Sequence, residues 1–365
     1  MPWIHLHVGY QGKVSACCVA NIPFGNINSN SIDEIWNGKN IKDLREKFLK
    51  GEMDNRCGAC INIEKAGGKS IRMETHEKFD DIDVTQIEAP IYYDIRFSNL
   101  CNLKCRTCWH GASSSWFDDA KELKSNLGEK AIIMNVHDYE RFIDLWGESI
   151  LKAKEIYFAG GEPLMMEEHY RLLKYLIENE AVNIHLRYNT NISQLTYKDE
   201  NLNELWSKFT SVEIMASLDA HEEKGEYIRQ NLKWNKVEEN LQLLKSYQNI
   251  YLKLAPTIST MNTDVLVDFI PYMIDKGFID VNDIYINLLE RPHFYNVKSY
   301  TSEEKKEVEK SILTLIDYLK EKEANELTIA SFHDIISFMN EKDLSKLRPK
   351  AHSYNQKLDQ LFTRK

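Results

Sequence analysis

The chain has 365 residues, of which 43% are hydrophobic and 28% are charged, as is typical of a soluble globular protein. No apolar run approaches the roughly 20 residues needed to cross a bilayer, so we expect no membrane-spanning segment. The net charge of −10, without a block rich in Lys and Arg, argues against a nucleic-acid-binding protein but leaves binding of a small nucleotide open.

The length fits one barrel-sized domain plus a smaller part. The first residues, Met1-Pro2-Trp3-Ile4-His5, lack the basic-then-apolar order of a signal peptide. We therefore expect a cytoplasmic location.

The first segment predicts a β-hairpin. Residues 3–8 alternate between apolar and polar types, residues 10–12 read as a turn with glycine at the reversal, and residues 13–17 return as a second strand. A further turn is expected at residues 25–28.

A helix is predicted to follow this hairpin. Ser31 and Glu34 have the spacing of a capping box, and Gly51 is a plausible C-terminal stop. Gly38 and Asn40 weaken the middle of this helix. Its apolar positions are Ile32, Ile35, Trp36, Leu44 and Phe48.

From residue 89 onward, short strand-like runs alternate with helical stretches such as residues 170–177. The runs cover residues 91–97, 155–158, 183–188, 212–217, 251–257 and 283–287. This alternation predicts βαβ units with a parallel sheet, and six of them favour a partial (β/α)6 barrel. The fold class is therefore α/β. We expect three parts: residues 1–88, the barrel at 89–300 and a C-terminal helical extension at 301–365.

All seven cysteines lie within the first 108 residues, which is unlike a disulfide framework and typical of metal ligands. Cys101, Cys105 and Cys108 have the spacing C-x3-C-x2-C. Three thiolates on one loop can hold three irons of a [4Fe–4S] cluster and leave the fourth iron open to a substrate or cofactor. This motif indicates an enzyme rather than a structural metal site.

Polar motifs follow the predicted strands at their carboxyl ends, where barrel enzymes place their chemistry. The cysteine loop follows the first strand. The motifs after the next five are Gly160-Gly161-Glu162-Pro163, Thr190-Asn191, Ser217-Leu218-Asp219, Pro256-Thr257 and Asn287.

The segment from Asp94 to Cys108, followed by Gly160-Gly161-Glu162-Pro163, resembles the radical S-adenosylmethionine (radical SAM) superfamily. The N-terminal pattern, with Cys17-Cys18 and Cys57-x-x-Cys60, is similar to the twitch/SPASM auxiliary-cluster domain. The resemblance implies that the cluster on Cys101, Cys105 and Cys108 binds S-adenosylmethionine (SAM). Reductive cleavage would then give a 5′-deoxyadenosyl radical, which removes a hydrogen atom from the substrate.

The resemblance also implies cofactor-binding roles for individual residues. Gly160, Gly161, Glu162 and Pro163 would let the backbone approach the methionine amino group. Alternative roles remain open for the others: strand-end capping for Ser217 and Asp219, a surface ion pair for Arg229, and packing for Trp109 and His110. As cofactor-binding residues, Ser217 and Asp219 would contact the methionine carboxylate or the ribose, and Arg229 the carboxylate. Asn191 would contact the ribose, and Trp109 and His110 would border the adenine.

Cys17, Cys57 and Cys60 are the expected ligands of a second, auxiliary iron–sulfur cluster. Cys18 is an alternative ligand, or else a buried small hydrophobic residue. His5 and His7 share one face of the hairpin and are either a ligand source or polar surface. A zinc site on the same thiolates is the competing metal assignment.

We expect a radical SAM enzyme acting on a small polar metabolite, such as a sugar or nucleotide derivative, with the auxiliary cluster aiding oxidation or substrate positioning. A reducing flavodoxin- or ferredoxin-like partner would supply electrons. One alternative is a peptide-modifying maturase. An alternative from another class is a non-catalytic iron–sulfur or zinc protein that senses redox state or binds a partner.

Overall fold

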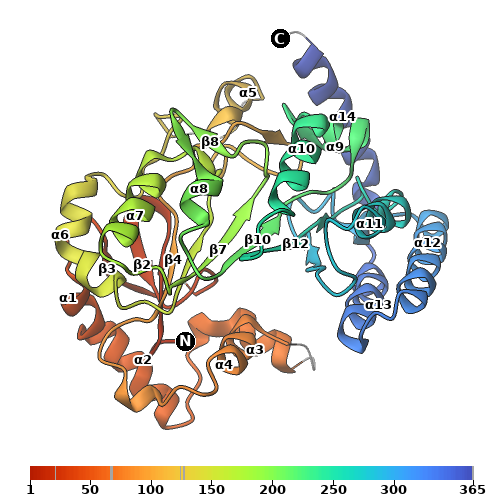
Figure 1. Cartoon of the computed structure of the whole chain (residues 1–365). Coiled ribbons are helices and arrows are strands. Elements are labelled where there is room, and N and C mark those ends of the chain that lie inside the picture. The colour runs from red at the N-terminus through yellow and green to blue at the C-terminus, as the bar shows by residue number, and fades with distance from the viewer. Residues whose placement is uncertain (21, 66–68, 124, 126–127, 364–365) are drawn as a thin grey trace. The chain divides into compact units, whose positions relative to one another are not determined.

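The computed structural model describes residues 1–20, 22–65, 69–123, 125 and 128–363. It is a mixed α/β fold with parallel strands, consistent with a partial barrel, and a helical C-terminal region, so the predicted fold class is confirmed (Figure 1). The chain forms two compact units, which are described separately. Unit 1 comprises Met1–Cys101, Ile132–Asn189 and Thr196–Val212, and unit 2 comprises Asn102–Ala131, Thr190–Leu195 and Glu213–Lys365.

The sheet of unit 1 joins the predicted N-terminal hairpin to the first barrel strands. Its order is β7 (His185–Thr190), β6 (Glu155–Phe158), β4 (Tyr92–Ile95), β1 (His5–Val8), β2 (Lys13–Ser15) and β3 (Pro23–Asn26). The hairpin is confirmed, since β1 and β2 are antiparallel. On its other side β1 runs parallel to β4, so the hairpin extends the sheet rather than standing apart.

Helices cover one face of this sheet with aromatic contacts. They are α6 (Tyr139–Ile150), α7 (Glu167–Glu178) and α8 (Leu202–Trp206). The ring centroids of Tyr93 and Trp146 are 6.3 Å apart, and those of Tyr188 and Trp206 are 5.1 Å apart. Large apolar side chains at alternate strand positions therefore form the core on this face. The unit also contains a short hairpin of β8 (Thr196–Tyr197) and β9 (Glu200–Asn201).

The N-terminal part of the chain also forms helices, which are α1 (Ile32–Trp36), α2 (Lys39–Leu49), α3 (Gly58–Lys65) and α4 (Ile71–Lys78). Of these, α2, α3 and α4 lie near the N-terminus in Figure 1. The capping box of Ser31 and Glu34 is confirmed. The single helix expected from residue 32 onward is wrong: it breaks at Gly38, where an ideal Cβ would lie 2.8 Å from a carbonyl oxygen of the preceding turn.

The end of α2 and the turn before α1 also test the sequence prediction. Gly51 has a φ of +71° and ends α2, as predicted. The turn expected at residues 25–28 starts later, because Gly25 and Asn26 complete β3. Pairing with β2 keeps these two residues extended.

Unit 2 continues the alternation of strands and helices. Its neighbouring strands are β10 (Val212–Ala216) and β12 (Ile250–Leu254), and its helices include α5 (Phe117–Glu122), α9 (Glu222–Ile228), α10 (Trp234–Leu244) and α11 (Leu266–Asp275). The sixth strand expected at residues 283–287 is not continuous. Ile284 forms one bridge with Leu254, and Pro256, which has no N–H group, separates it from the pairing of β13 (Thr257–Ile258) with β14 (Asn287–Leu288).

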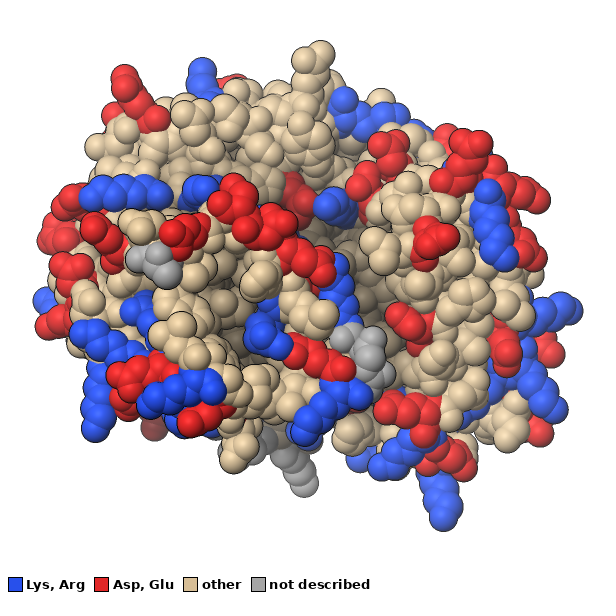
Figure 2. Space-filling view, turned by 90° about the horizontal axis from the view of Figure 1, so that it is seen from below, with Lys and Arg blue, Asp and Glu red and all other residues tan. Residues whose placement is uncertain are grey.

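Three helices form the C-terminal region: α12 (Ser302–Glu321), α13 (Glu326–Asn340) and α14 (Arg348–Thr363). Thr301 and Glu304 form a capping box at the start of α12. In the described part of the chain, no helix combines the length and the apolar character required to span a bilayer. Figure 2 shows basic and acidic side chains interspersed on the face that it presents.

Candidate cluster and cofactor sites

The Gly160–Pro163 loop packs against the start of the cysteine loop. Gly160 and Gly161 have φ values of +80° and +42°, which favour glycine. An ideal Cβ on Gly161 would lie 2.2 Å from the carbonyl oxygen of Leu100, the residue before Cys101. The Glu162 N–H donates a hydrogen bond to the same oxygen at 2.7 Å. The sequence therefore brings this loop against the predicted cluster loop through backbone contacts that only glycine permits.

The cluster loop itself continues from buried Cys101 into a short strand. Cys105 lies in β5 (Lys104–Cys105), which pairs with β11 (Arg229–Gln230) and places Arg229 opposite it. The Cys108 N–H donates to the Cys105 carbonyl at 2.9 Å, so these two cysteines share one turn. Both are partly buried.

Burial disfavours the thiolate form of these cysteines. It raises the pKa of Cys105, although Arg229 opposes the shift. Together with nearby Cys105, burial raises the pKa of Cys108 to about 12. A thiol in such a place gains its deprotonated form mainly by binding a metal, so this donor set fits an iron–sulfur cluster.

Arg229 and Asp219 lie together beside Cys105. Arg229 Nη1 is 3.5 Å from Cys105 Sγ, and its Nε is 2.9 Å from Asp219 Oδ2 in an ion pair without hydrogen-bond alignment. Both residues are buried, so the expected surface ion pair of Arg229 is a buried one. Burial opposes the charge on Arg229, but Asp219 and Cys105 outweigh it and raise its pKa. Asp219 Oδ1 also accepts the Thr257 N–H at 2.8 Å, which is a structural, strand-end role.

Asn191 reaches the cluster loop through its side chain. Its Nδ2 donates to Asn102 Oδ1 at 3.1 Å, and Asn102 Nδ2 donates to Ser193 Oγ at 2.8 Å. The Ser217 N–H donates to the Thr190 carbonyl at 2.8 Å, which places Ser217 next to the end of β7. Asn191 therefore contacts the cluster loop and Ser217 lies beside Thr190, while their contacts with SAM stay a prediction.

Trp109 is 60% exposed, and its ring lies 5.1 Å from that of His110. An ideal Cβ on Gly111 would clash with the Trp109 ring, so glycine at position 111 allows the ring to fold back over the chain. The packing role considered for Trp109 is thus local, while its surface remains open to solvent.

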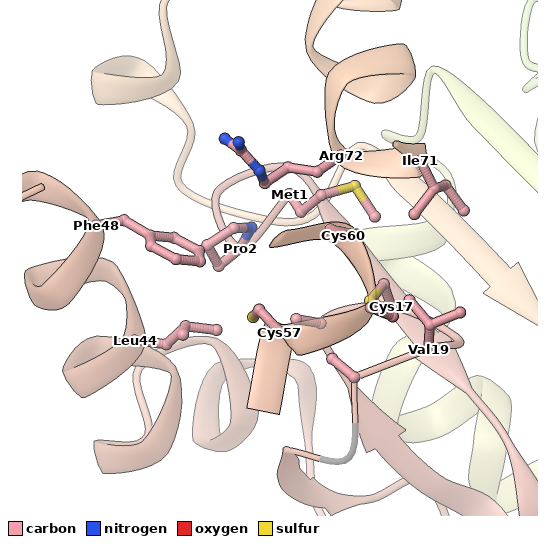
Figure 3. A pocket seen from close by; sticks show the side chains of 13 residues that line it. Met1, Pro2, Cys17, Val19, Leu44, Phe48, Cys57, Cys60, Ile71 and Arg72 are labelled. Carbon is pink, nitrogen blue, oxygen red and sulfur yellow. The ribbon is translucent and has the colours of Figure 1, made fainter. Parts of the chain in front are cut away.

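The three cysteines predicted for an auxiliary cluster line one apolar pocket in unit 1 (Figure 3). Cys17 follows β2, and Cys57 and Cys60 lie around the start of α3. The remaining lining residues are Met1, Pro2, Ala16, Val19, Ala20, Leu44, Phe48, Ala59, Ile71 and Arg72. Burial raises the pKa of Cys17 and of Cys57. These side chains are therefore thiols when no metal is bound, and binding a metal would favour their thiolate form.

Three alternative ligands of the auxiliary site, Cys18, His5 and His7, do not line this pocket. Cys18 is exposed and does not line the pocket, so its description as a buried hydrophobic residue is wrong. His5 and His7 are buried, so the polar-surface description is wrong as well, because β1 is an interior strand between β2 and β4. Their Nδ1 atoms contact the Ala16 carbonyl at 2.7 Å and Asp94 Oδ2 at 2.8 Å, respectively.

Among the described residues, no group of three or more His, Cys, Asp or Glu side chains converges tightly enough to hold a single metal ion. A single zinc ion requires such convergence at about 2.3 Å from each sulfur. A cluster binds each thiolate through a different iron, so its ligands can lie further apart.

Unit 1 contains a polar row that sequence reasoning missed. His7, Asp94, Tyr157 and Arg187 are register partners on adjacent parallel strands, and they alternate with the apolar core positions. Asp94 also faces Arg96, with 3.3 Å between Oδ1 and Nε. Burial opposes ionisation of Asp94, but Arg96 and His7 outweigh it and hold its pKa well below the usual range. The signal in the sequence was the polar alternation of Tyr92, Asp94 and Arg96.

Comparison with known proteins agrees with this geometry. The Radical SAM superfamily model matches residues 95–268, and the SPASM model, an iron–sulfur cluster-binding domain, matches residues 1–61. Residues 95–268 belong to the radical SAM superfamily. Membership implies a [4Fe–4S] cluster and SAM, and the SPASM match implies an auxiliary iron–sulfur cluster. A search of curated sequences returned no match.

Solved radical SAM structures show limited similarity to the chain. Native anSMEcpe with bound AdoMet and Kp18Cys peptide is 19% identical over 62% of this chain and 60% of that one, with a TM-score of 0.42. Streptococcus suis SuiB bound to precursor peptide SuiA is 14% identical over 78% and 60%, with a TM-score of 0.43. TYW1 with a lysine-pyruvate adduct is 15% identical over 62% and 70%, with a TM-score of 0.33. The chain thus spans about 60% of the length of anSMEcpe and SuiB.

Proposed function

We propose that this radical SAM enzyme abstracts a hydrogen atom from a small polar metabolite, a sugar or nucleotide derivative. When bound and reduced, the first cluster supplies cleavage of SAM to methionine and a 5′-deoxyadenosyl radical. Cys101, Cys105 and Cys108 would hold that cluster. The second set, Cys17, Cys57 and Cys60, would hold an auxiliary cluster that accepts an electron or helps to position the substrate.

Other expectations belong to the same proposal. The chain would divide into an auxiliary domain at 1–88, a barrel at 89–300 and a C-terminal extension at 301–365. A flavodoxin- or ferredoxin-like protein would supply electrons in the cytoplasm. Gly160, Gly161, Glu162 and Pro163 would receive the methionine amino group through the backbone.

The remaining cofactor residues would act around Cys105. Arg229 is held by Asp219 through Nε and directs Nη1 toward the sulfur, and its guanidinium would bind the methionine carboxylate. Asn191 would reach the ribose from the loop that it already orders through Asn102. Ser217 and Trp109 would border the ribose and the adenine.

The polar face of the unit 1 sheet carries the proposal of a polar substrate. Parallel sheets normally bury apolar side chains on both faces, because helices cover both. Here the face opposite α6 and α7 instead has His7, Asp94 and Arg96 in contact with one another. Burying charged groups is costly unless they find polar partners. These side chains already pair with one another, so the face stays polar without a ligand, and it would hydrogen bond to a substrate rich in hydroxyl or phosphate groups better than to an apolar one.

This polar face extends from the level of the predicted auxiliary-cluster site to the level of the Gly160–Pro163 loop, and both of these lie in unit 1. At one end His5 contacts the carbonyl of Ala16, the residue before Cys17. At the other end the aliphatic part of Arg96 lies beneath Gly160, where an ideal Cβ would be 3.0 Å from Arg96 Cβ. His5 is paired with Tyr92 of β4, and Arg96 follows Tyr92 by four residues, so the two ends of the face are roughly 13 Å apart. That spacing supports a substrate that lies along the face.

Formation of 5′-deoxyadenosine tests the enzymatic assignment. Protein reconstituted and reduced without oxygen should form 5′-deoxyadenosine from SAM, and Cys105→Ala should abolish this product. Cys18→Ala is the matched control, because Cys18 is exposed and outside both ligand sets, and it should keep wild-type activity. If the wild type forms no more 5′-deoxyadenosine than the Cys105→Ala background, the assignment is rejected in favour of a non-catalytic iron–sulfur protein.

The substrate class needs a separate experiment. The reduced enzyme is incubated with SAM and, in parallel, with pools of sugar nucleotides and of short peptides, and transfer of substrate deuterium into 5′-deoxyadenosine is measured. We expect transfer from the sugar nucleotides. Transfer from peptides alone would replace the proposal with the peptide-modifying maturase.

A further inference from the structure

The last helix, α14, contacts the cluster loop on both sides of Cys105. Arg106, which follows Cys105, has a side chain that is only 2% exposed. A buried guanidinium is stable only when its donors are paired. Its Nη2 lies 2.5 Å from Asp359 Oδ1 of α14, and its Nε donates to the Tyr227 carbonyl at 2.8 Å.

Aromatic contacts complete this arrangement. The Arg106 guanidinium lies 3.7 Å from the Tyr227 ring centroid and 5.4 Å from that of Phe362. On the other side of Cys105, Lys104 pairs with buried Asp119 at 2.6 Å and lies 5.1 Å from the Phe362 ring. Phe362 therefore contacts the residues before and after one predicted cluster ligand.

Apolar packing joins α14 to a second ligand. Trp116, Leu358 and Leu361 form a buried cluster against which Cys108 packs. The Trp116 indole N–H also donates to the Cys105 carbonyl at 3.1 Å. The stripe that α14 turns inward thus covers the turn from Cys105 to Cys108.

The first half of α14, away from Asp359, is also held in place by side-chain contacts. Asn355 of α14 accepts a hydrogen bond from the Tyr295 hydroxyl, and Tyr354 packs against Phe294 with ring centroids 5.2 Å apart. Because α14 is fixed to the chain after β14 as well as to the cluster loop, motion of the helix and motion of the loop are coupled.

We propose that α14 is a clamp over the cluster loop and that Arg106 is its positioning residue. The clamp keeps the sulfurs of Cys105 and Cys108 in place and excludes oxygen and solvent from the cluster. Opening of the clamp would expose the iron–sulfur bonds to oxidants, so the Arg106–Asp359 pair sets how long the cluster survives in air. This role concerns cluster retention and is independent of the substrate.

The test uses Asp359→Asn, which removes the ion pair and keeps the side-chain size. The matched control is Asp334→Asn, the same change at an exposed position of α13. Asp359→Glu is the conservative rescue. Each full-length protein is reconstituted without oxygen and then exposed to air, and the decay of the SAM-responsive electron paramagnetic resonance signal is followed. That signal reports the cluster with an open iron and not the auxiliary one.

We expect the signal to decay at least fivefold faster in Asp359→Asn than in the wild type and in Asp334→Asn, with most of the lifetime restored in Asp359→Glu. Hydrogen exchange of residues 104–112 and 348–363 should accelerate in Asp359→Asn alone. An unchanged decay in Asp359→Asn, or an equal acceleration in Asp334→Asn, would overturn the clamp.

Two further outcomes are separable. If Asp359→Asn does not fold, Phe362→Leu, which shortens the contact with Lys104 and Arg106 without changing charge, is measured in its place against the same criteria. If the wild type forms no SAM-responsive signal, the cluster assignment fails rather than the clamp alone.

Discussion

Replacing Gly161 by alanine, together with a matched control, should separate the cost of backbone strain from the cost of steric contact in the Gly160–Pro163 loop. An alanine there meets two penalties. A left-handed conformation costs a non-glycine residue roughly 1–2 kcal/mol. Overlap with fixed backbone adds about 1–3 kcal/mol, because the new Cβ would lie 2.2 Å from the Leu100 carbonyl oxygen and 2.7 Å from the Asn99 carbonyl carbon.

Gly51 provides the matched control. Its φ is +71°, also in the left-handed region, but nothing lies within 4 Å of an ideal Cβ. Gly51→Ala should therefore lose only the conformational part, roughly 1–2 kcal/mol, whereas Gly161→Ala should lose roughly 2–5 kcal/mol. The difference between the two variants isolates the contact with Leu100.

Two measurements check this prediction. Urea unfolding of the apoprotein, followed by circular dichroism and tryptophan fluorescence, gives the free energy of unfolding. Equilibrium dialysis of the reconstituted protein gives SAM binding, which should weaken at least tenfold in Gly161→Ala and stay unchanged in Gly51→Ala. Equal unfolding energies and equal SAM binding in the two variants would refute the idea that the glycine loop rests on the residue before Cys101.

Two predictions concern other parts of unit 1. Burial lowers the pKa of His169 from 6.5 to about 3. Between these pH values only the unfolded chain binds the proton, so lowering the pH from 7 to 5 should reduce the free energy of unfolding by roughly 2 kcal/mol. In His169→Gln that part of the pH dependence of urea unfolding should disappear, and an unchanged slope would show that other groups dominate. Replacing Cys57 by serine should remove about half of the iron bound after reconstitution, since each cluster type holds several irons, whereas Cys18→Ser should remove none; equal iron contents would contradict the auxiliary ligand set.

The local part of the fold follows from the sequence because its causes are local. The strands at 155–158 and 212–217 were predicted from short apolar runs, and β6 and β10 occupy them almost residue for residue. Gly51 and the capping box at Ser31 were correct for the same reason, since each needs only neighbours within one helical turn.

Long-range pairing explains what the sequence did not reveal. His7 looked like hairpin surface, but its partner Asp94 lies 87 positions away on β4 and buries it. Arg106 had no visible role, because Asp359 follows it by 253 positions. The sixth strand is broken because residues 284 and 287–288 pair with residues on opposite sides of Pro256. The periodicity of the sequence does not reveal such long-range pairing.

The family motifs were visible because they combine unusual residue types at fixed spacing. The cysteine loop and Gly160-Gly161 are such motifs, and the structure adds the reason for the glycines: the Leu100 carbonyl leaves no room for a side chain. Arg229 lies beside Cys105, but its ion pair with Asp219 could not be predicted from the sequence, because it depends on the fold.

The parallel pairing of β1 with β4 has a consequence for synthesis of the chain. A ribosome adding roughly 5–20 residues per second makes His7 about 4–17 seconds before Asp94, its partner 87 positions later. During that interval one edge of the newly made meander has exposed N–H and C=O groups, a template for wrong partners. The hairpin that leads to Cys17 is therefore not an autonomous module: separating it from the strands that follow would leave an open sheet edge on both fragments.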